Sequence, residues 1–303
     1  MTSDRPRIAV LGEKFFPSRG GTSRVVESTV RALSDRYAFT VYCYPDPEAR
    51  GLVPGVTVVE IPRPRIPGFG VFAYFFRCLL HALRSDYDLF HVHKLDAAFL
   101  LPVLVRRAPC VATCHEVPYL NEKWSVVGRL YFRVMERLFV RARATRTCVS
   151  REQQRHFRAR FGVEVEYVPN GVDPPRIDVG AAEARLAGAG VDGPFLLFAA
   201  RRIIPLKGLH TLIEALRKRA APETLVVLGD ESHTPDYVAR VRALAAGLDV
   251  RFLGYVEDPG ELMGIVARAE TFVFPSEREG MSVMLLEVAS VGTPIVCSDI
   301  SQN

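Results

Sequence analysis

The chain has 303 residues, of which 49% are hydrophobic and 24% charged. This is ordinary globular composition, and the length allows two domains of about 150 residues each. Its 39 Lys and Arg against 34 Asp and Glu give a formal charge of +5, which suits anionic small ligands or an anionic membrane surface. The sequence shows no zinc-finger spacing, signal peptide or long apolar run, so we expect a cytoplasmic protein without a nucleic-acid partner or a membrane span.

Short apolar runs alternate with helical patterns along the chain. Runs of this kind are typical of parallel strands buried on both faces, and the alternation predicts an α/β fold with doubly wound sheets. The predicted strands are Ile8–Leu11, Phe39–Tyr44, Val56–Ile61, Leu89–Val92, Cys110–Thr113, Thr147–Val149, Val163–Val168, Phe195–Ala199, Thr224–Leu228, Val250–Leu253, Thr271–Phe274 and Ile295–Cys297. The clearest predicted helices are Arg24–Leu33, Val71–Leu83, Val126–Arg143, Leu209–Lys218 and Tyr237–Ala245.

The composition changes once, in the Pro-, Ala- and Gly-rich interval from Val172 to Gly193. An interval of this kind between two strands predicts a domain boundary. We therefore expect an N-terminal domain of residues 1–175 and a C-terminal domain of residues 176–303, both Rossmann-like and facing each other across a cleft.

Two loops in the first half follow predicted strands. The first ends in Gly20-Gly21 before a helix; paired glycines let the backbone approach a diphosphate, and the helix N-terminus attracts anions. The second carries His115, at a strand end where doubly wound folds bind their ligands. The alternatives are a plain βα loop for the first and a capping or core histidine for the second.

Patterns that bind metals are weak in this sequence. Asp86 and Asp88 precede an apolar strand, where acids commonly mark the strand entry. His91 and His93 point to one face of that strand but have no third partner in the sequence, so buried structural histidines are the better interpretation. The six cysteines are scattered, mostly in apolar runs, as buried thiols of a reducing compartment are. We therefore expect no metal site and no cofactor.

The segment 129–160 is strongly basic, with ten Arg and two Glu, a local charge of +8. Four arginines recur at every fourth position of its predicted helix: Arg129, Arg133, Arg137 and Arg141. The side chains expected on its apolar side are Tyr131, Val134, Met135 and Leu138. A basic amphipathic helix can bind an anionic bilayer, and a helix packed on the core with a solvated basic face is the alternative.

The second half places charged residues around two predicted strand ends. Arg202 and Lys207 lie five apart between a strand and a helix, a spacing that predicts a diphosphate clamp, with ordinary surface charge as the alternative. Glu279 and Glu287 follow the strand Thr271–Phe274, one in a loop and one in the next helix. Two such carboxylates can accept hydrogen bonds from two hydroxyl-rich groups of one extended ligand. The helix N-terminus between them can bind an anionic group of the same ligand. A nucleotide sugar has this character.

The stretch Glu279 to Glu287 closely resembles the Glu-x7-Glu signature of retaining glycosyltransferases of family 4, including the later Gly292-Thr293-Pro294. The stretch Arg202 to Gly208 is similar to the family's Gly-Arg-Leu-x-x-x-Lys-Gly, with Arg201 in place of the usual Gly. Supporting resemblances, in family order, are Pro17-x-x-Gly20-Gly21, His115-Glu116, the architectural segment Val168-Pro169-Asn170-Gly171-Val172-Asp173 with its Asn-Gly turn, and Arg251 to Val256.

This resemblance implies a GT-B fold and metal-independent transfer of a sugar, with retention, from a nucleoside diphosphate sugar to a glycan or lipid-linked acceptor, in cell-surface polysaccharide or glycolipid biosynthesis. It implies that Glu279 and His115 contact the transferred sugar, and that Glu287 binds the ribose. The implied catalytic residues are His115, Glu279, Arg202 and Lys207. The implied donor-binding residues are Gly20, Gly21, Arg202, Lys207, Gly280, Met281, Ser282, Val283 and Glu287.

Chains of this family normally continue well past Gly292-Thr293-Pro294, whereas this sequence ends at Asn303. We therefore expect the second domain to be incomplete. The alternative function is a non-catalytic nucleotide-sugar-binding or partner subunit. A sugar-nucleotide epimerase is a more remote alternative, because it would need additional acid/base carboxylates.

Overall fold

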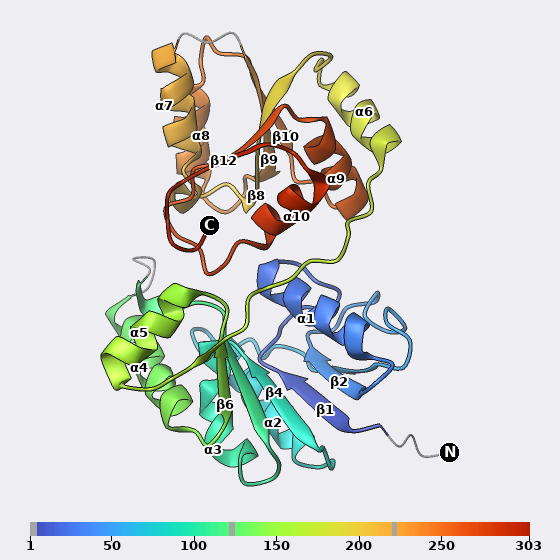
Figure 1. The fold of residues 1–303 in the computed structure, drawn as a ribbon, viewed down its shortest axis with the longest axis vertical. Coiled ribbons are helices and arrows are strands. Elements are labelled where there is room, and N and C mark those ends of the chain that lie inside the picture. Colours follow the sequence, from blue (N-terminus) through green and yellow to red (C-terminus); the bar gives the residue numbers. More distant parts are fainter. Residues whose placement is uncertain (1–4, 121–124, 220–222) are drawn as a thin grey trace. The chain divides into compact units, whose positions relative to one another are not determined.

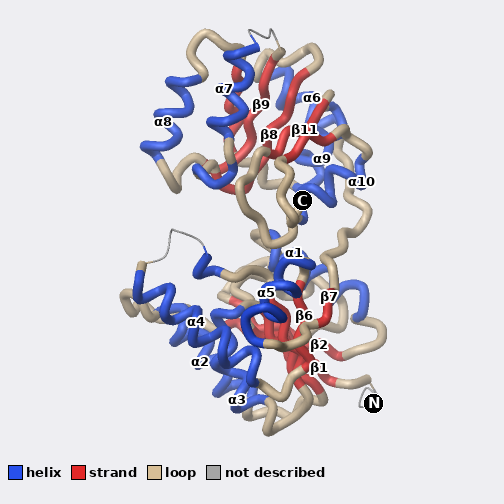
Figure 2. The backbone as a smooth tube through the Cα atoms, turned by 60° about the vertical axis from the view of Figure 1, so that its left-hand side comes forward, coloured by secondary structure: helices blue, strands red, loops and turns tan. Residues whose placement is uncertain are grey.

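The computed structural model describes residues 5–120, 125–219 and 223–303. It divides into two compact units, Met1–Gly171 and Val172–Asn303, and each is an α/β unit built on a parallel sheet (Figures 1 and 2). The α/β class predicted from the sequence is confirmed.

Unit 1 contains a seven-stranded sheet in the order β3-β2-β1-β4-β5-β6-β7, with every neighbouring pair parallel. Its strands are β1 Arg7–Leu11, β2 Ala38–Cys43, β3 Thr57–Glu60, β4 Leu89–His93, β5 Cys110–Cys114, β6 Thr145–Cys148 and β7 Glu166–Tyr167. Its helices are α1 Gly21–Leu33, α2 Gly70–Ala82, η1 Leu95–Leu100, α3 Leu101–Leu104, η2 Pro118–Leu120, α4 Val126–Arg141 and α5 Arg151–Phe161, where η marks a 3-10 helix.

Both faces of this sheet are buried, as near-continuous apolar strands predict. Along β1, Ile8 and Val10 pack with Val26 of α1 on one face. The alternate residues Ala9 and Leu11 belong to the larger core on the other face, which α2, α3, α4 and α5 also contribute to. Strand order and helices on both faces place the carboxyl ends of β1, β4 and β5 side by side, where open α/β sheets bind their ligands.

Unit 2 repeats this plan with five parallel strands in the order β10-β9-β8-β11-β12. Its strands are β8 Phe195–Arg202, β9 Thr224–Asp230, β10 Val250–Gly254, β11 Thr271–Phe274 and β12 Ile295–Cys297. Its helices are α6 Val179–Gly188, η3 Pro205–Lys207, α7 Leu209–Arg219, α8 Pro235–Leu244, α9 Pro259–Arg268 and α10 Val283–Val291.

Alternate residues of the central strands again enter two different cores. Leu197 of β8 packs in the core formed with α6, α9 and α10, whereas its neighbour Phe198 packs in the core formed with α7 and α8. Figure 1 shows these two groups of helices on opposite sides of the sheet. The strand order makes β8 and β11 neighbours, so the loops that follow them lie next to each other at one edge.

Several details of the structure differ from the sequence-based expectation. The chain from Val168 to Asp178 has no regular element, and the turn predicted at Asn170-Gly171 does not form. The predicted strand Val163–Val168 is reduced to the two residues of β7, because β7 is an edge strand that pairs only with β6. Cys297 lies on the edge strand β12 and is exposed, whereas the other five cysteines are buried as predicted.

The predicted apolar side of α4 is partly wrong. Val134 is exposed, and the buried residues are Phe132, Met135, Glu136, Phe139 and Val140. Glu136 turns inward because other elements supply partners for its carboxylate: the Tyr119 hydroxyl donates to it over 3.0 Å and His156 Nε2 lies 2.7 Å away. Among the helices of the described residues, none is long and apolar enough to cross a membrane.

Candidate functional site

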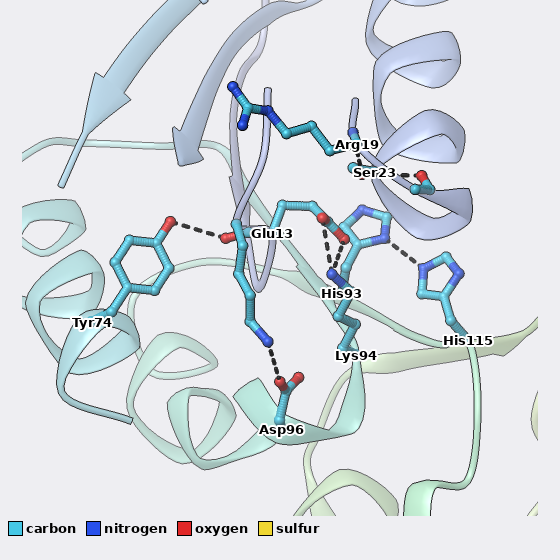
Figure 3. A network of polar contacts seen from close by, with 10 residues as sticks. Glu13, Arg19, Ser23, Tyr74, His93, Lys94, Asp96 and His115 are labelled. Atoms are coloured by element: carbon cyan, nitrogen blue, oxygen red, sulfur yellow. Dashed lines mark hydrogen bonds and ion pairs between the residues drawn. The ribbon is translucent and has the colours of Figure 1, made fainter. Parts of the chain in front are cut away.

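Two of the histidines noted in the sequence meet at the carboxyl ends of neighbouring strands in unit 1 (Figure 3). His93 is the last residue of β4 and His115 follows β5; Nδ1 of His93 lies 3.0 Å from Nε2 of His115. The backbone carbonyl of His115 accepts a hydrogen bond from Gln153 Nε2 at 2.9 Å. His91 lies on the same face of β4, as predicted, with its ring 3.9 Å from that of His93 and its Nε2 2.9 Å from Thr113 Oγ1.

These imidazoles are neutral at physiological pH. Burial lowers the pKa of His115 to about 3, with the positive charge of Lys94 as the next cause, and burial lowers the pKa of His91 to about 4. Burial, with His91 and His115 nearby, also lowers the pKa of His93 well below its ordinary value. A neutral imidazole has one donor and one acceptor nitrogen, so one ring of the His93–His115 pair donates and the other accepts.

A buried ion pair lies beside the histidines. Lys94 Nζ is 2.9 Å from the carboxylate of Glu13, whose side chain is completely buried after β1. Lys94 has a positive φ of 68°, which is rare for a residue other than glycine and is often found at functional sites. Lys14, the neighbour of Glu13, pairs with Asp96 at 3.1 Å. The network in Figure 3 therefore joins the strand ends of β1 and β4 through charges that sequence analysis did not single out.

The glycine pair lies at the start of α1 in the same unit. Gly21 is the first residue of the helix, and the carbonyl of Gly20 accepts hydrogen bonds from Arg24 N at 2.9 Å and Ser23 Oγ at 3.0 Å. This places both glycines where the sequence predicts them, at a helix N-terminus that favours anions.

In unit 2 the structure brings Lys207 and Glu279 together, although they are 72 positions apart in the sequence. Lys207 ends η3 after β8, and Glu279 lies in the loop after β11. Nζ of Lys207 is 2.5 Å from Oε1 of Glu279, and Ser276 Oγ donates to the same oxygen at 2.6 Å. Both side chains are largely buried, with 23% of Lys207 and 13% of Glu279 exposed.

The two loops that carry this pair are packed tightly against each other. Glu277 N donates to the Leu206 carbonyl at 3.0 Å. Gly208 has a φ of 71°, and a Cβ added there would lie 2.0 Å from the carbonyl oxygen of Pro275. Only glycine satisfies both conditions, the left-handed backbone and the close approach. The glycine that follows Lys207 therefore has a steric reason in this chain.

The other residues of unit 2 that the sequence predicts for the site lie before Lys207 or after Glu279. Arg202 is exposed at the end of β8, whereas Glu287 is buried on α10. The stretch from Gly280 leads into α10, whose cap is Ser282; its hydroxyl accepts the Leu285 N–H at 3.3 Å. Met281 lies in this stretch and Val283 is the first residue of α10.

The arrangement in unit 2 offers a cation, a carboxylate and a helix N-terminus along the ends of β8 and β11. A site of this kind can bind an anion beside a hydroxyl-rich group. The sequence predicted Lys207 and Glu279 as site residues, but it did not predict their ion pair or the part that Ser276 takes in it. Within residues 5–120, 125–219 and 223–303, no three His, Cys, Asp or Glu side chains are grouped to hold a metal ion.

Several known proteins resemble this chain. It is 29% identical over 221 residues to the phosphatidyl-myo-inositol mannosyltransferase of Mycobacterium tuberculosis, a match that covers 71% of this chain but 56% of that protein. It is 27% identical over 337 aligned positions to the D-inositol 3-phosphate glycosyltransferase of Xylanimonas cellulosilytica, covering 97% of this chain and 81% of that one. The chain thus spans little more than half the length of its mycobacterial relative.

The fold is also found in solved structures. Anabaena HepE in complex with UDP and glucose matches with a TM-score of 0.78 at 21% identity, covering 98% of this chain and 82% of that one. Residues 19–176 match the family model described as Glycosyltransferase Family 4, and residues 193–303 match the model described as Glycosyl transferases group 1. Since the first of these models alone covers more than half of the sequence, the chain belongs to glycosyltransferase family 4.

Proposed function

We propose that the protein transfers a sugar, with retention, from a nucleoside diphosphate sugar to a glycan or lipid-linked acceptor. The observation that carries this proposal is the contact between Lys207 and Glu279. It places a cation suited to a diphosphate directly beside a carboxylate suited to sugar hydroxyls, at the strand ends where parallel α/β sheets bind ligands.

In this proposal Lys207 and Arg202 stabilise the negative charge that develops on the leaving diphosphate, the contribution that usually dominates such catalysis. An ammonium has three donors, so Lys207 can hold Glu279 and still donate to a phosphate oxygen. Glu279 binds the transferred sugar together with the backbone from Gly280 to Val283, and Glu287 binds the ribose. The backbone of Gly20 and Gly21 assists at the diphosphate.

His115 contacts the transferred sugar in this proposal. Its imidazole is neutral because burial lowers its pKa to about 3, so it acts as a hydrogen-bonding group and not as an acid at pH 7. In this proposal no side chain acts as a covalent nucleophile, and the acceptor attacks on the same face that the diphosphate leaves. The positive charges of Arg202 and Lys207 supply the stabilisation that a metal provides elsewhere, so the proposal requires no metal ion.

The names of two relatives suggest the chemical class of the acceptor. These relatives are named for phosphatidyl-myo-inositol and for D-inositol 3-phosphate, both polyols that carry phosphate. HepE was solved with UDP and glucose, which supports a nucleoside diphosphate as part of the donor. We therefore propose an acceptor with several hydroxyl groups, used in cell-surface polysaccharide or glycolipid synthesis on the cytoplasmic side of the membrane.

We further propose that α4 contacts an anionic membrane surface. Its exposed side combines arginines with apolar side chains, and its acid, Glu136, is completely buried. The exposed apolar residues are Val126, Val127, Leu130 and Val134, and the exposed arginines are Arg129, Arg133, Arg137 and Arg141. Apolar groups that enter the interface beside cations that meet lipid phosphates are typical of peripheral membrane helices.

The rival proposal is a subunit that binds a nucleotide sugar without transferring it. It uses the same residues, so only turnover distinguishes the two. An epimerase would need additional acid/base carboxylates beside the sugar.

The experiment that tests the proposed function is a calorimetric and thermal-shift titration with UDP, GDP, ADP and their common sugar conjugates, without added metal. A ligand that binds the folded state raises the unfolding midpoint by mass action. A selective shift with one nucleotide would identify the donor class, and release of that diphosphate in the presence of acceptor would separate transferase from binder. Absence of any shift would reject the proposal.

A further inference from the structure

Ser276 lies at the point where the two loops of the unit 2 site meet. Its side chain is completely buried. Its Oγ is 2.6 Å from Oε1 of Glu279, and 3.3 and 3.4 Å from the carbonyl oxygens of Leu206 and Arg278. A serine hydroxyl has a single proton, and a charged acceptor at the shortest distance forms the strongest bond. Ser276 therefore donates its proton to Glu279.

The two contacts of the Glu279 carboxylate use the same oxygen. Ser276 Oγ and Lys207 Nζ both meet Oε1, at 2.6 and 2.5 Å. Oε2 takes part in neither contact. A carboxylate fixed through one oxygen has a defined orientation for the other, because two donors from different elements prevent rotation about the last side-chain bond.

We propose that Ser276 is a positioning residue for sugar binding: it holds Glu279 so that Oε2 meets a hydroxyl of the transferred sugar. This inference rests on the proposed function and deepens it, since it divides the site into two parts. Lys207 serves the diphosphate and the carboxylate together, whereas Ser276 serves only the carboxylate and hence only the sugar.

The loops do not depend on Ser276 to stay together. The hydrogen bond from Glu277 N to the Leu206 carbonyl and the close approach of Gly208 to Pro275 join them through the backbone. Ser276→Ala removes one oxygen atom and leaves these contacts in place. The substitution therefore separates the orientation of Glu279 from the integrity of the loops.

The test compares the affinity for a nucleoside diphosphate with the affinity for its sugar conjugate, by calorimetry, together with turnover. We expect S276A to bind the free diphosphate within about twofold of the unmodified protein, but to lose about tenfold in kcat, equal to about 1.4 kcal/mol. S276A should also bind the sugar conjugate no more tightly than the free diphosphate. S276T, which keeps the hydroxyl, should retain both, and S276C, which keeps the shape with a weak donor, should behave like S276A.

A double-mutant comparison decides between positioning and a merely structural role. The quantity to compare is the ratio of the affinity for the sugar conjugate to the affinity for the free diphosphate. This ratio should be the same in S276A/E279A as in E279A, because Ser276 acts only through Glu279. Equal losses of diphosphate affinity and turnover in S276A, or a further loss in the double variant, would overturn the inference.

A crystal structure of S276A gives a readout that does not depend on activity. We expect the Glu279 side chain to leave its present orientation, and an unchanged side chain would again overturn the inference. If the unmodified protein bound every ligand of the titration equally poorly while Glu279 moved in S276A, the proposed function would fail and not the role of Ser276 in holding Glu279.

Discussion

Nδ1 of His93 and Nε2 of His115 share a hydrogen bond of 3.0 Å, although the two residues are 22 positions apart on neighbouring strands. Both imidazoles are buried, and burial lowers the pKa of each. A proton on either ring would place a charge in this buried site beside Lys94, whose ammonium already opposes it. The pair therefore remains neutral in the folded state.

The first prediction concerns stability at low pH. In the unfolded chain a histidine has a pKa of about 6.5, whereas His91 and His115 have values of about 4 and about 3 in the folded state. Above pH 6.5 neither state takes up protons at these sites. Between pH 6.5 and 4 the unfolded state takes up protons that the folded state refuses, so the free energy of unfolding falls as the pH falls, by at most about 1.4 kcal/mol per pH unit for each histidine.

Urea denaturation at pH 7.5, 6.0 and 5.0, followed by circular dichroism, measures this slope. His93→Asn should reduce the slope of the unfolding free energy against pH by at most about 1.4 kcal/mol per pH unit, which corresponds to one proton. We expect this even though the variant is less stable at pH 7.5. An identical slope in the variant and the unmodified protein would show that His93 is protonated in the folded state.

The second prediction concerns Glu279. Glu279→Ala should lower kcat by at least about a hundredfold, which corresponds to about 2.7 kcal/mol of lost transition-state stabilisation. The affinity for the free nucleoside diphosphate should stay nearly unchanged, because Lys207 and Arg202 remain. Kinetics and calorimetry on the same preparation measure both quantities, and an equal loss of both would contradict the assignment of Glu279 to the sugar.

The third prediction concerns Lys207. Lys207→Ala should weaken diphosphate binding about ten- to a hundredfold, since a charge-assisted hydrogen bond is lost and the carboxylate of Glu279 is left without its cation. Lys218→Ala, at an exposed lysine of α7, is the matched control and should bind normally. Unaltered affinity in Lys207→Ala would mean that the diphosphate binds elsewhere.

The fourth prediction concerns Gly208. Gly208→Ala places a Cβ 2.0 Å from the Pro275 carbonyl oxygen and also strains a backbone with φ of 71°. Gly190→Ala is a matched control, since Gly190 has nearly the same φ of 69° but open space around it. The control should lose about 1–2 kcal/mol of stability, and Gly208→Ala should lose about 1–3 kcal/mol more together with nucleotide affinity. Denaturation curves measure both losses. If Gly208→Ala and Gly190→Ala lost the same free energy of unfolding, the loops around Gly208 and Pro275 would be able to move apart at no cost.

The fifth prediction concerns α4. Replacing Arg129, Arg133 and Arg137 with Gln should reduce binding to vesicles of anionic lipid by about 1 kcal/mol for each charge. Replacing the exposed Arg217, Lys218 and Arg219 of α7 with Gln removes the same charge and should have little effect. Vesicle sedimentation at low and physiological salt measures both. If the unmodified protein does not sediment with the vesicles, the membrane proposal is wrong.

The sequence alone was sufficient for the fold class and for the order of the strands. The run Thr271–Phe274 becomes β11 with the predicted bounds, because a strand inside a parallel sheet is covered on both faces and must be apolar throughout. The run Ile295–Cys297 becomes β12 with the predicted bounds as well, although β12 is an edge strand and largely exposed. The family motifs likewise locate Gly20, Lys207 and Glu279 at the ends of predicted strands, since turn residues and helix starts are local features of the chain.

The tertiary structure decided which of these residues meet. The ion pair of Lys207 and Glu279 exists because β8 and β11 are neighbours in the sheet, and the His93–His115 contact exists because β4 and β5 are. Strand order is a long-range property that periodicity does not encode. The same reason explains Glu136, which faces inward on α4 only because Tyr119 and His156 come from other elements to satisfy its carboxylate. Local patterns determine what each segment forms, and the packing of distant segments determines which charges can be buried.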